Sequence, residues 1–296
     1  MGRRVAAVVN PAKVPDQAQL RRQIEEAAQA AGFEPVLWSE TTVEDPGFGQ
    51  ARSALEQGAE LVLACGGDGT VTACASALAE SGAALALIPY GTGNLLARNL
   101  AVPSDAEQAL QLAFAGERRA IDVVRCQPGS HFIVMAGLGF DAAMIAETNE
   151  DTKARIGWPA YIGGIVRALR VSHRTRFDIV VDGAIPFSVR GIGVLIGNVG
   201  ELQAGLSVFP DASPTDEILD LIVFAPAGWR DWPLILGRLI GRRTSAGGRT
   251  ETRRGRRIEI TCDRPLQLEF DGDLYGPTST FTAEVVPGGV TVCVPA

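Results

Sequence analysis

The sequence has few of the residues that build metal centres, disulfide frameworks and histidine-dependent active sites. Only five of its 296 residues are cysteines, and two are histidines. The cysteines stand at positions 65, 74, 126, 262 and 293, and no pair has the CxxC spacing of a zinc or redox motif. His131 and His173 have no cysteines or carboxylates at ligand spacing, which argues against a zinc site and a Ser-His-Asp triad. We therefore expect reduced, buried thiols in a cytoplasmic protein.

Long apolar segments and an excess of positive charge are also missing. No apolar run approaches the roughly 20 residues that a helix needs to cross a bilayer. The run Val5–Val9 is too short for the core of a signal peptide. Lys and Arg number 27 against 34 Asp and Glu, a formal net charge of −7, so we expect no nucleic-acid partner.

The first part of the chain alternates apolar runs with segments of helical pattern. Hydrophobic residues make up 46% of the sequence, enough for a folded core, and the length predicts two domains or one large one. Strands are expected at residues 4–9, 35–38, 61–65 and 85–89, and helices at 16–31, 49–57 and 71–80. This alternation predicts βαβ units and an open parallel sheet, whose ligands lie beyond the carboxyl ends of the strands.

The second part of the chain is rich in strand patterns separated by turn signals. Strands are expected at residues 132–136, 176–181, 189–196, 218–225, 258–262, 266–270 and 290–294, with turns at Asp182-Gly183, Asp271-Gly272 and Gly288-Gly289. Helical patterns at 159–171 and 229–240 interrupt them. We therefore predict an α/β domain over residues 1–125 and a β-sandwich domain over 126–296, with the option that the last strands pack back on the first domain.

Two glycine-rich loops follow consecutive strands of the predicted sheet. The first is Gly66-Gly-Asp-Gly-Thr70, and the second is Gly91-Thr-Gly-Asn94. Glycine lets a bulky anion approach the backbone amides, and a helix that follows attracts phosphate to its N-terminus. Asp68 repels phosphate, so it calls for a bridging Mg²⁺ or a hydrogen-bonded partner. The structural alternative is a tight turn with an aspartate cap, with Thr70 as another candidate cap.

Taken together, these loops resemble the diacylglycerol kinase catalytic-domain family. The resemblance lies in Gly66–Thr70 and in Ile88-Pro-Tyr-Gly-Thr-Gly-Asn94, and the family includes bacterial diacylglycerol kinases, YegS-like lipid kinases, sphingosine kinases and ceramide kinases. It extends through most of the chain. Further matches are Val9-Asn10-Pro11, Thr42, Ile121-Asp122-Val123, Ala136-Gly-Leu-Gly-Phe-Asp141, Pro210-Asp-Ala-Ser-Pro-Thr-Asp216 and Phe270-Asp271-Gly272-Asp273.

The resemblance implies a fold, a set of ligands and a set of roles. It implies a nucleotide-binding α/β domain like those of NAD kinases and phosphofructokinases, then a β-sandwich, with the lipid site between them. Asp68 would act through Mg²⁺, Asp122 would assist in the cleft, and Asp271 or Asp273 would be the base. Asp216 would hold a structural Mg²⁺ with the carbonyls of Ser213 and Ile218. The ATP-binding residues would be Asn10, Thr42, Gly66, Gly67, Asp68, Gly69, Thr70, Gly91, Thr92, Gly93 and Asn94.

Three positions depart from the family pattern. Leu95 stands where an aspartate often follows the second glycine loop, and Asp273 stands in place of the usual glutamate. Glu217 replaces the glycine of the metal loop. Asp271-Gly272 is also a strong hairpin signal, so these residues have a purely structural interpretation as well.

Two neighbouring segments are candidates for membrane contact. Trp229–Ile240 places tryptophans and leucines on one helical stripe, which is typical of a core-facing helix or of an interfacial one. Arg242–Arg257 carries seven arginines and one glutamate, which is typical of a solvated loop or of a patch that binds anionic lipid.

Three functions are consistent with the sequence. The first is an ATP- and Mg²⁺-dependent kinase of a diacylglycerol-like or other long-chain lipid alcohol, acting in phospholipid metabolism and peripheral on the inner face of the membrane. The second is a kinase of a soluble substrate such as NAD. The third is a catalytically silent nucleotide- or lipid-binding protein. The oligomeric state stays open.

Overall fold

A computed structural model describes residues 3–127, 130–139, 174–200, 208–227, 231 and 250–296. The chain divides into two compact units, which are described separately. The first comprises Met1–Val123 with Val286–Ala296, and the second comprises Val124–Val285.

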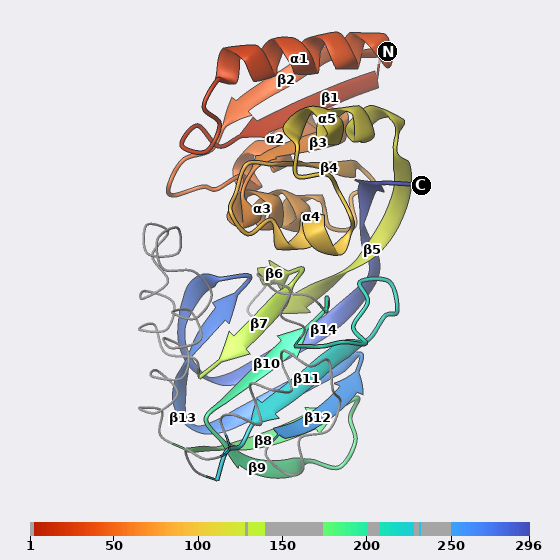
Figure 1. Ribbon diagram of the computed structural model, residues 1–296. Coiled ribbons are helices and arrows are strands. Elements are labelled where there is room, and N and C mark those ends of the chain that lie inside the picture. The colour runs from red at the N-terminus through yellow and green to blue at the C-terminus, as the bar shows by residue number, and fades with distance from the viewer. Residues whose placement is uncertain (1–2, 128–129, 140–173, 201–207, 228–230, 232–249) are drawn as a thin grey trace. The chain divides into compact units, whose positions relative to one another are not determined.

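The first unit is built on a parallel sheet, as the sequence predicts (Figure 1). Its strands stand in the order β2, β1, β3, β4, β14. Each neighbouring pair runs parallel. The fifth position is filled by the chain's own end, where Thr291 and Val292 pair with Ala84 and Leu85. The central strands are almost fully buried, which explains their continuous apolar runs. The strands are β1 (Arg3–Val9), β2 (Phe33–Glu40), β3 (Ala59–Gly66), β4 (Ala84–Pro89) and β14 (Asp273–Val294).

Helices cover both faces of this sheet. Because crossover connections between parallel strands are right-handed, α1 lies on one face and α2 and α3 lie on the other. Contacts between α1 and α5, and between α2 and α3, complete the two layers. The sequence predicted the first three helices within a few residues and missed the last two. The helices are α1 (Gln17–Ala30), α2 (Phe48–Glu56), α3 (Asp68–Leu78), α4 (Leu95–Asn99) and α5 (Ala106–Ala115).

The second unit is an antiparallel arrangement in the order β12, β11, β10, β7, β13, β14. The pair β8 and β9 adds to β13, and β5 and β6 add to β14. The strands are β5 (Glu117–Cys126), β6 (Ser130–Phe132), β7 (Met135–Leu138), β8 (Thr175–Val181), β9 (Phe187–Gly191), β10 (Gly193–Gly197), β11 (Leu219–Phe224), β12 (Thr250–Gly255) and β13 (Arg257–Phe270).

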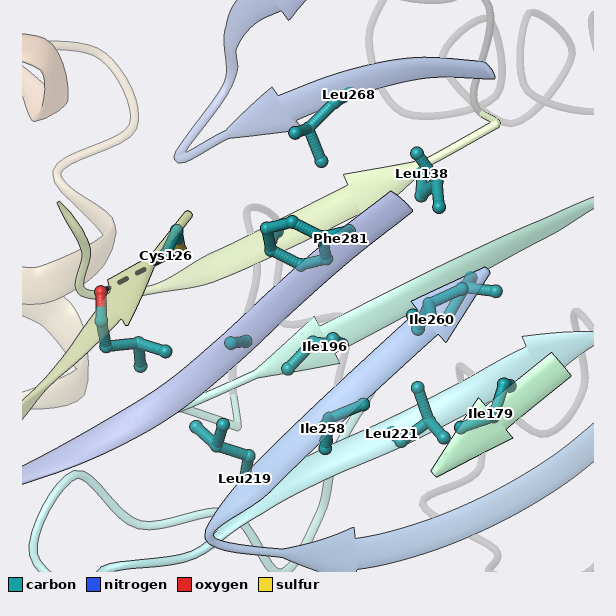
Figure 2. Close-up of a cluster of buried hydrophobic side chains, with 14 of the residues drawn as sticks. Cys126, Leu138, Ile179, Ile196, Leu219, Leu221, Ile258, Ile260, Leu268 and Phe281 are labelled. Carbon is teal, nitrogen blue, oxygen red and sulfur yellow. Dashed lines mark hydrogen bonds between the residues drawn. The ribbon is translucent and has the colours of Figure 1, made fainter. Parts of the chain in front are cut away.

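The long strand β13 makes this unit sandwich-like. Residues 258–262 of β13 pair with β8, and residues 268–270 pair with β7, with a register shift between the two stretches. One strand therefore takes part in two layers, and its inward side chains meet those of the other strands in a common core (Figure 2). Figure 2 shows Ile258, Ile260 and Leu268 of β13 in this core with Phe281 of β14 and Ile196 of β10.

Several predicted strand boundaries in this unit are wrong. The run 132–136 is divided between β6 and β7, because the amides of Ile133 and Val134 bond to Asp271 instead of a strand. The run 189–196 is divided between β9 and β10 at Ile192, and the runs 258–262 and 266–270 form one strand. Gly288-Gly289 lies inside β14 and does not separate strands. The helical patterns at 159–171 and 229–240 lie outside the described residues, apart from Asp231.

All five cysteines are buried and unpaired, as the sequence predicts. Burial raises the pKa of every one of these thiols, to about 11 for Cys293 and to about 12 for Cys262. These cysteines act as small hydrophobic core residues and carry no reactive thiolate.

Candidate functional site

The ends of four parallel strands meet at one edge of the first unit. Val9 of β1 is level with Cys65 of β3, and Gly66 is level with Pro89 of β4. Hydrogen bonds continue one residue beyond the strands, from Asn10 N to Cys65 O (2.9 Å) and from Tyr90 N to Gly66 O (2.8 Å). The structure therefore brings the loops that carry Asn10, Thr42, Gly66–Thr70 and Gly91–Asn94 together at the edge where ligands bind in open α/β sheets.

The two glycine loops touch through their backbones. A Cβ atom at Gly91 would lie 2.6 Å from the Cα atom of Gly67 and 2.8 Å from Oδ1 of Asn94. Real Cβ contacts are not that short, so position 91 tolerates only glycine unless the loops separate. Asn94 closes the second loop: its Oδ1 accepts from Gly91 N (3.1 Å), and its Nδ2 donates to Gly91 O (2.7 Å).

We expect Gly91→Ala to separate the two loops. Nucleotide affinity should fall by about tenfold or more, because a shift of about 1 Å in a positioned site has large effects. Equilibrium binding of a fluorescent ATP analogue checks this. Gly82→Ala is the control, since it adds backbone strain at φ +80° in open space, and β4 separates it from the second loop. Equal binding by the Gly91→Ala protein and the wild type would contradict the prediction.

Asp68 connects the two loops through its carboxylate. Its Oδ1 accepts a 2.5 Å hydrogen bond from Leu95 N, the first residue of α4. Burial raises the pKa of Asp68, while hydrogen bonds from the amides of Leu95 and Asn94 and the charge of Arg98 oppose the rise. Arg98 is an exposed cation on α4 that the sequence interpretation missed; its only signal is a basic residue in the helix after the second loop.

The helix after the first loop begins earlier than predicted. α3 starts at Asp68 with Gly67 as its N-cap, and this residue supplies no side-chain cap. Its N-terminal amides therefore remain available to a ligand at this edge. The prediction of Thr70 as a cap is wrong: Thr70 is 2% exposed, lies within α3 and packs against Gly66 at the end of β3.

The other predicted nucleotide-binding side chains shape their own loops. Asn10 Oδ1 accepts from Ala12 N (3.0 Å), which tightens the turn after β1. Thr42 Oγ1 accepts from Asp45 N (3.1 Å) in the loop after β2. Their contact with a nucleotide stays a prediction.

Asp122 holds the chain's end onto the first unit. It is 2% exposed, and its Oδ1 accepts from Gly288 N (2.9 Å) at the bend of β14. This bond ties β5 to β14, so Asp122 has a structural role within this unit. Its assistance in the cleft stays a prediction.

The late acidic motif separates into two different environments. Asp271 forms the hairpin between β13 and β14 with Gly272, at φ +49° and +95°, as its turn signal predicts. Its carboxylate accepts three amides, from Ile133 (3.0 Å), Val134 (2.9 Å) and Met135 (2.9 Å). Asp271 therefore anchors the segment between β6 and β7, whereas Asp273 is exposed at the start of β14.

Glu269 is an acidic residue that the sequence interpretation passed over. It is half-buried, and a Cβ atom at Gly137 would lie 2.5 Å from its Oε1, so its side chain lies flat against β7. Burial, helped by the charge of Asp271, raises the pKa of Glu269 to about 7. A glutamate between the apolar residues Leu268 and Phe270 is the signal that could have found it.

We expect Glu269→Gln to change how stability depends on pH. The folded-state pKa of about 7 exceeds the ordinary value of 4.5, so the folded protein binds this proton more tightly. The contribution to stability is complete below the ordinary pKa and is lost as the pH rises through about 7. The wild type should therefore lose more stability than the variant between these values. Thermal unfolding across this range measures it, with Glu60→Gln as a control for lost charge; parallel wild-type and Glu269→Gln curves would contradict it.

The predicted metal loop is held by hydrogen bonds. Asp216 N donates to Ser213 O (3.3 Å), and Asp216 Oδ1 accepts from Ile218 N (3.1 Å). Asp216 Oδ2 accepts from the Arg254 guanidinium at 2.8 Å. Within the part of the chain that the structure describes, no cluster of three or more histidine, cysteine or carboxylate residues is arranged to hold a metal ion.

The described end of the arginine-rich segment is paired with carboxylates. Arg253 meets Glu251 and lies over the Phe187 ring, and Arg256 meets Glu217. Arg257 meets Glu259 and Glu284. These arginines therefore offer little uncompensated positive charge. Among the described residues, no helix has the length and apolar character needed to span a membrane.

The sheet, the two contacting glycine loops and the uncapped N-terminus of α3 define an α/β protein whose ligand edge suits a phosphate-bearing molecule. Comparison with known families agrees. The model of the diacylglycerol kinase catalytic domain matches residues 4–126, and that of the YegS C-terminal NAD kinase beta sandwich-like domain matches residues 133–294.

Individual relatives carry lipid-kinase names. A protein of Klebsiella pneumoniae (strain 342), named "Probable lipid kinase YegS-like", is 32% identical over 251 residues, 82% of this chain and 80% of that protein. A protein of the same name from Cronobacter sakazakii (strain ATCC BAA-894) is 38% identical over 180 residues, and the match spans only 58% of each chain. The chain belongs to the diacylglycerol kinase catalytic-domain family, with YegS-like lipid kinases among its relatives, which confirms the resemblance in its loops.

Solved structures share the fold. A diacylglycerol kinase from Bacillus anthracis str. Sterne superposes with a TM-score of 0.79 at 23% identity and covers 99% of this chain and 97% of its own. Yeast NADH kinase complexed with NADH has a TM-score of 0.53 at 12% identity, with 100% and 84% covered. The predicted α/β domain with a β-sandwich-like second domain is confirmed.

Proposed function

We propose that this protein transfers the γ-phosphoryl group of ATP to the hydroxyl of a diacylglycerol-like or other long-chain lipid alcohol. The observation that carries the proposal is the backbone contact between two glycine loops beside the uncapped N-terminus of α3, with Asp68 between them. Family membership supports a kinase, and the names of the relatives support a lipid acceptor.

On the nucleotide side, the chain's own groups hold and orient the triphosphate. The amides at the start of α3 donate to phosphate oxygens, and Gly67 and Gly91 allow the close approach. Asn10, Thr42, Thr92 and the remaining residues of the two loops complete the proposed ATP site. Mg²⁺ bound with ATP would neutralise phosphate charge, and the carboxylate oxygens of Asp68 are ligands of the hard kind that this ion prefers.

On the acceptor side, we propose that Asp273 takes the proton of the acceptor hydroxyl. Phosphoryl transfer to an alcohol requires that the acceptor hydroxyl be oriented and deprotonated. Asp271 already accepts three amide hydrogen bonds, whereas Asp273 is exposed. Asp273 therefore acts as the base in this proposal, and Asp271 positions the hairpin that carries it. We also propose that Asp122 assists in the cleft.

A lipid acceptor implies work at a membrane surface. We propose a cytoplasmic protein that contacts the membrane peripherally and acts in phospholipid metabolism. Residues 229–240 remain the candidate contact segment. The arginines at positions 253, 254, 256 and 257 contribute little to that contact. Each of them pairs with a carboxylate, which compensates its positive charge.

A soluble acceptor is the second candidate function. The fold shared with yeast NADH kinase favours it, although the match is weaker than that with the diacylglycerol kinase. An NAD kinase would transfer phosphate to NAD and ignore liposomes. A silent binder would hold ATP without turnover.

The test is transfer of radiolabelled γ-phosphate from ATP–Mg²⁺ to a panel of lipid alcohols in mixed micelles, with NAD and no-acceptor reactions alongside. Label in an organic-extractable product would support the proposal and begin to name the lipid. Label in NAD would favour the second function. Binding of ATP without transfer to any acceptor would favour the silent binder.

A further inference from the structure

The loop before β11 gathers acidic groups around one arginine. Arg254 of β12 stands directly opposite Asp220 of β11 in the antiparallel pair. Its Nε lies 3.1 Å from Asp220 Oδ1, and its Nη2 lies 2.8 Å from Asp216 Oδ2. The same Nη2 donates to the Asp211 carbonyl at 3.3 Å. One guanidinium therefore bonds to three oxygens that come from different parts of the loop and strand.

Arg256, which follows the last residue of β12, supports the neighbouring residue of the loop. Glu217 has a left-handed backbone at φ +60°, where a glycine would fit without cost. Its carboxylate pairs with Arg256. Glutamate at this position therefore brings a compensating ion pair. Asp216 pairs with Arg254 of β12, and Glu217 pairs with Arg256, which follows that strand. The two departures from a metal-binding pattern, an acidic residue for glycine and a cation on the aspartate, occur together.

The contacts around Asp216 do not suit a magnesium ion in addition to the arginine. Mg²⁺ requires near-octahedral oxygen ligands at about 2.0–2.1 Å. Here Asp216 Oδ1 is engaged by Ile218 N and Oδ2 by Arg254, so both of its oxygens already accept hydrogen bonds. The Ser213 carbonyl accepts from Asp216 N.

We infer that Arg254 takes the place of a structural divalent cation in the loop of residues 211–220, so that the loop closes without metal. A guanidinium keeps its charge at all accessible pH values and spreads several donors in one plane, so it can bind several oxygens at once. Oδ2 of Asp220 is buried and accepts no hydrogen bond from the described residues. This oxygen is therefore an acceptor that a cation could bind once Arg254 is removed.

The test compares metal binding and thermal unfolding of the full chain without nucleotide. Wild-type protein should have the same Tm in EDTA and in millimolar Mg²⁺, and Mn²⁺ titration followed by EPR should show no ion that Asp216→Asn removes. Arg254→Met should lower the Tm in EDTA by about 3–6 °C, and Mg²⁺ or Mn²⁺ should recover part of the loss. Arg253→Met is the matched control, because that arginine is on the same strand but pairs with Glu251 outside the loop. It should show no metal dependence.

Three results would overturn the inference. One is a wild-type Mn²⁺ site that Asp216→Asn abolishes, and this measurement decides the matter even if Arg254→Met fails to fold. Another is an Arg254→Met protein as stable in EDTA as the wild type. The third is an Arg254→Met protein that stays destabilised with every metal, which would make Arg254 an ordinary ion-pair partner. None of these readouts depends on kinase activity.

Discussion

Replacing Asp68 by asparagine is expected to reduce phosphoryl transfer by about a hundredfold or more while the protein stays folded. Asparagine keeps an oxygen at Oδ1 that can accept the hydrogen bond from Leu95 N, so the link between the first loop and α4 survives. What disappears is the negative charge beside the proposed phosphate site. The measurement is initial-rate transfer from ATP–Mg²⁺ to the best lipid of the panel, with thermal unfolding on the same preparation.

Asp68→Ala separates the charge from the hydrogen bond. Alanine removes both, so it should match the asparagine variant in rate and fall below it in Tm. A folded Asp68→Asn protein with near wild-type turnover would remove Asp68 from the mechanism. It would leave the loops as the only support for nucleotide binding at this edge.

Asp273→Asn is expected to lower turnover by about 10²–10⁴-fold with little change in Tm, because a general base contributes about that much. Asp273 is exposed at the start of β14, so its charge contributes little to the stability of the folded protein. The rate should be measured across pH at saturating ATP and lipid. A variant that keeps its rate would exclude Asp273 as the base and return the role to another acidic group.

The neighbouring substitution Asp271→Asn provides the contrast. Asparagine cannot accept all three amides that the carboxylate of Asp271 accepts, so we expect a loss of about 2–4 kcal/mol in the free energy of unfolding. Denaturant unfolding measures it. A fully stable Asp271→Asn protein would show that the three amides do not depend on this carboxylate.

The first unit follows closely from its sequence. Its strands are buried on both faces, so apolar runs such as residues 61–65 mark them directly, and each is joined to the next by a local helix. The glycine loops stand at strand ends, and strand ends of a parallel sheet share one edge. The gathering of Asn10, Thr42, Asp68 and Asn94 was therefore predictable from the sequence alone.

The second unit was predictable in class and less so in detail. Turns such as Asp271-Gly272 can be predicted from the local sequence, because a left-handed backbone conformation depends on the residue itself. Strand pairing depends on partners far along the chain. The division of residues 132–136 and the joining of 258–262 with 266–270 both arise from such partners, so no local pattern contains them.

By itself, the sequence determined the parallel α/β sheet, the two glycine loops at its carboxyl edge and the family to which they belong. These depend on burial and backbone freedom, which individual residues and short patterns carry. Only the tertiary structure decided that Asp271 anchors amides while Asp273 stays exposed, that Glu269 lies against Gly137, and that Arg254 closes the acidic loop. The physical reason is the same in each case. The charge and hydrogen-bonding state of a carboxylate depend on neighbours that folding brings from distant positions.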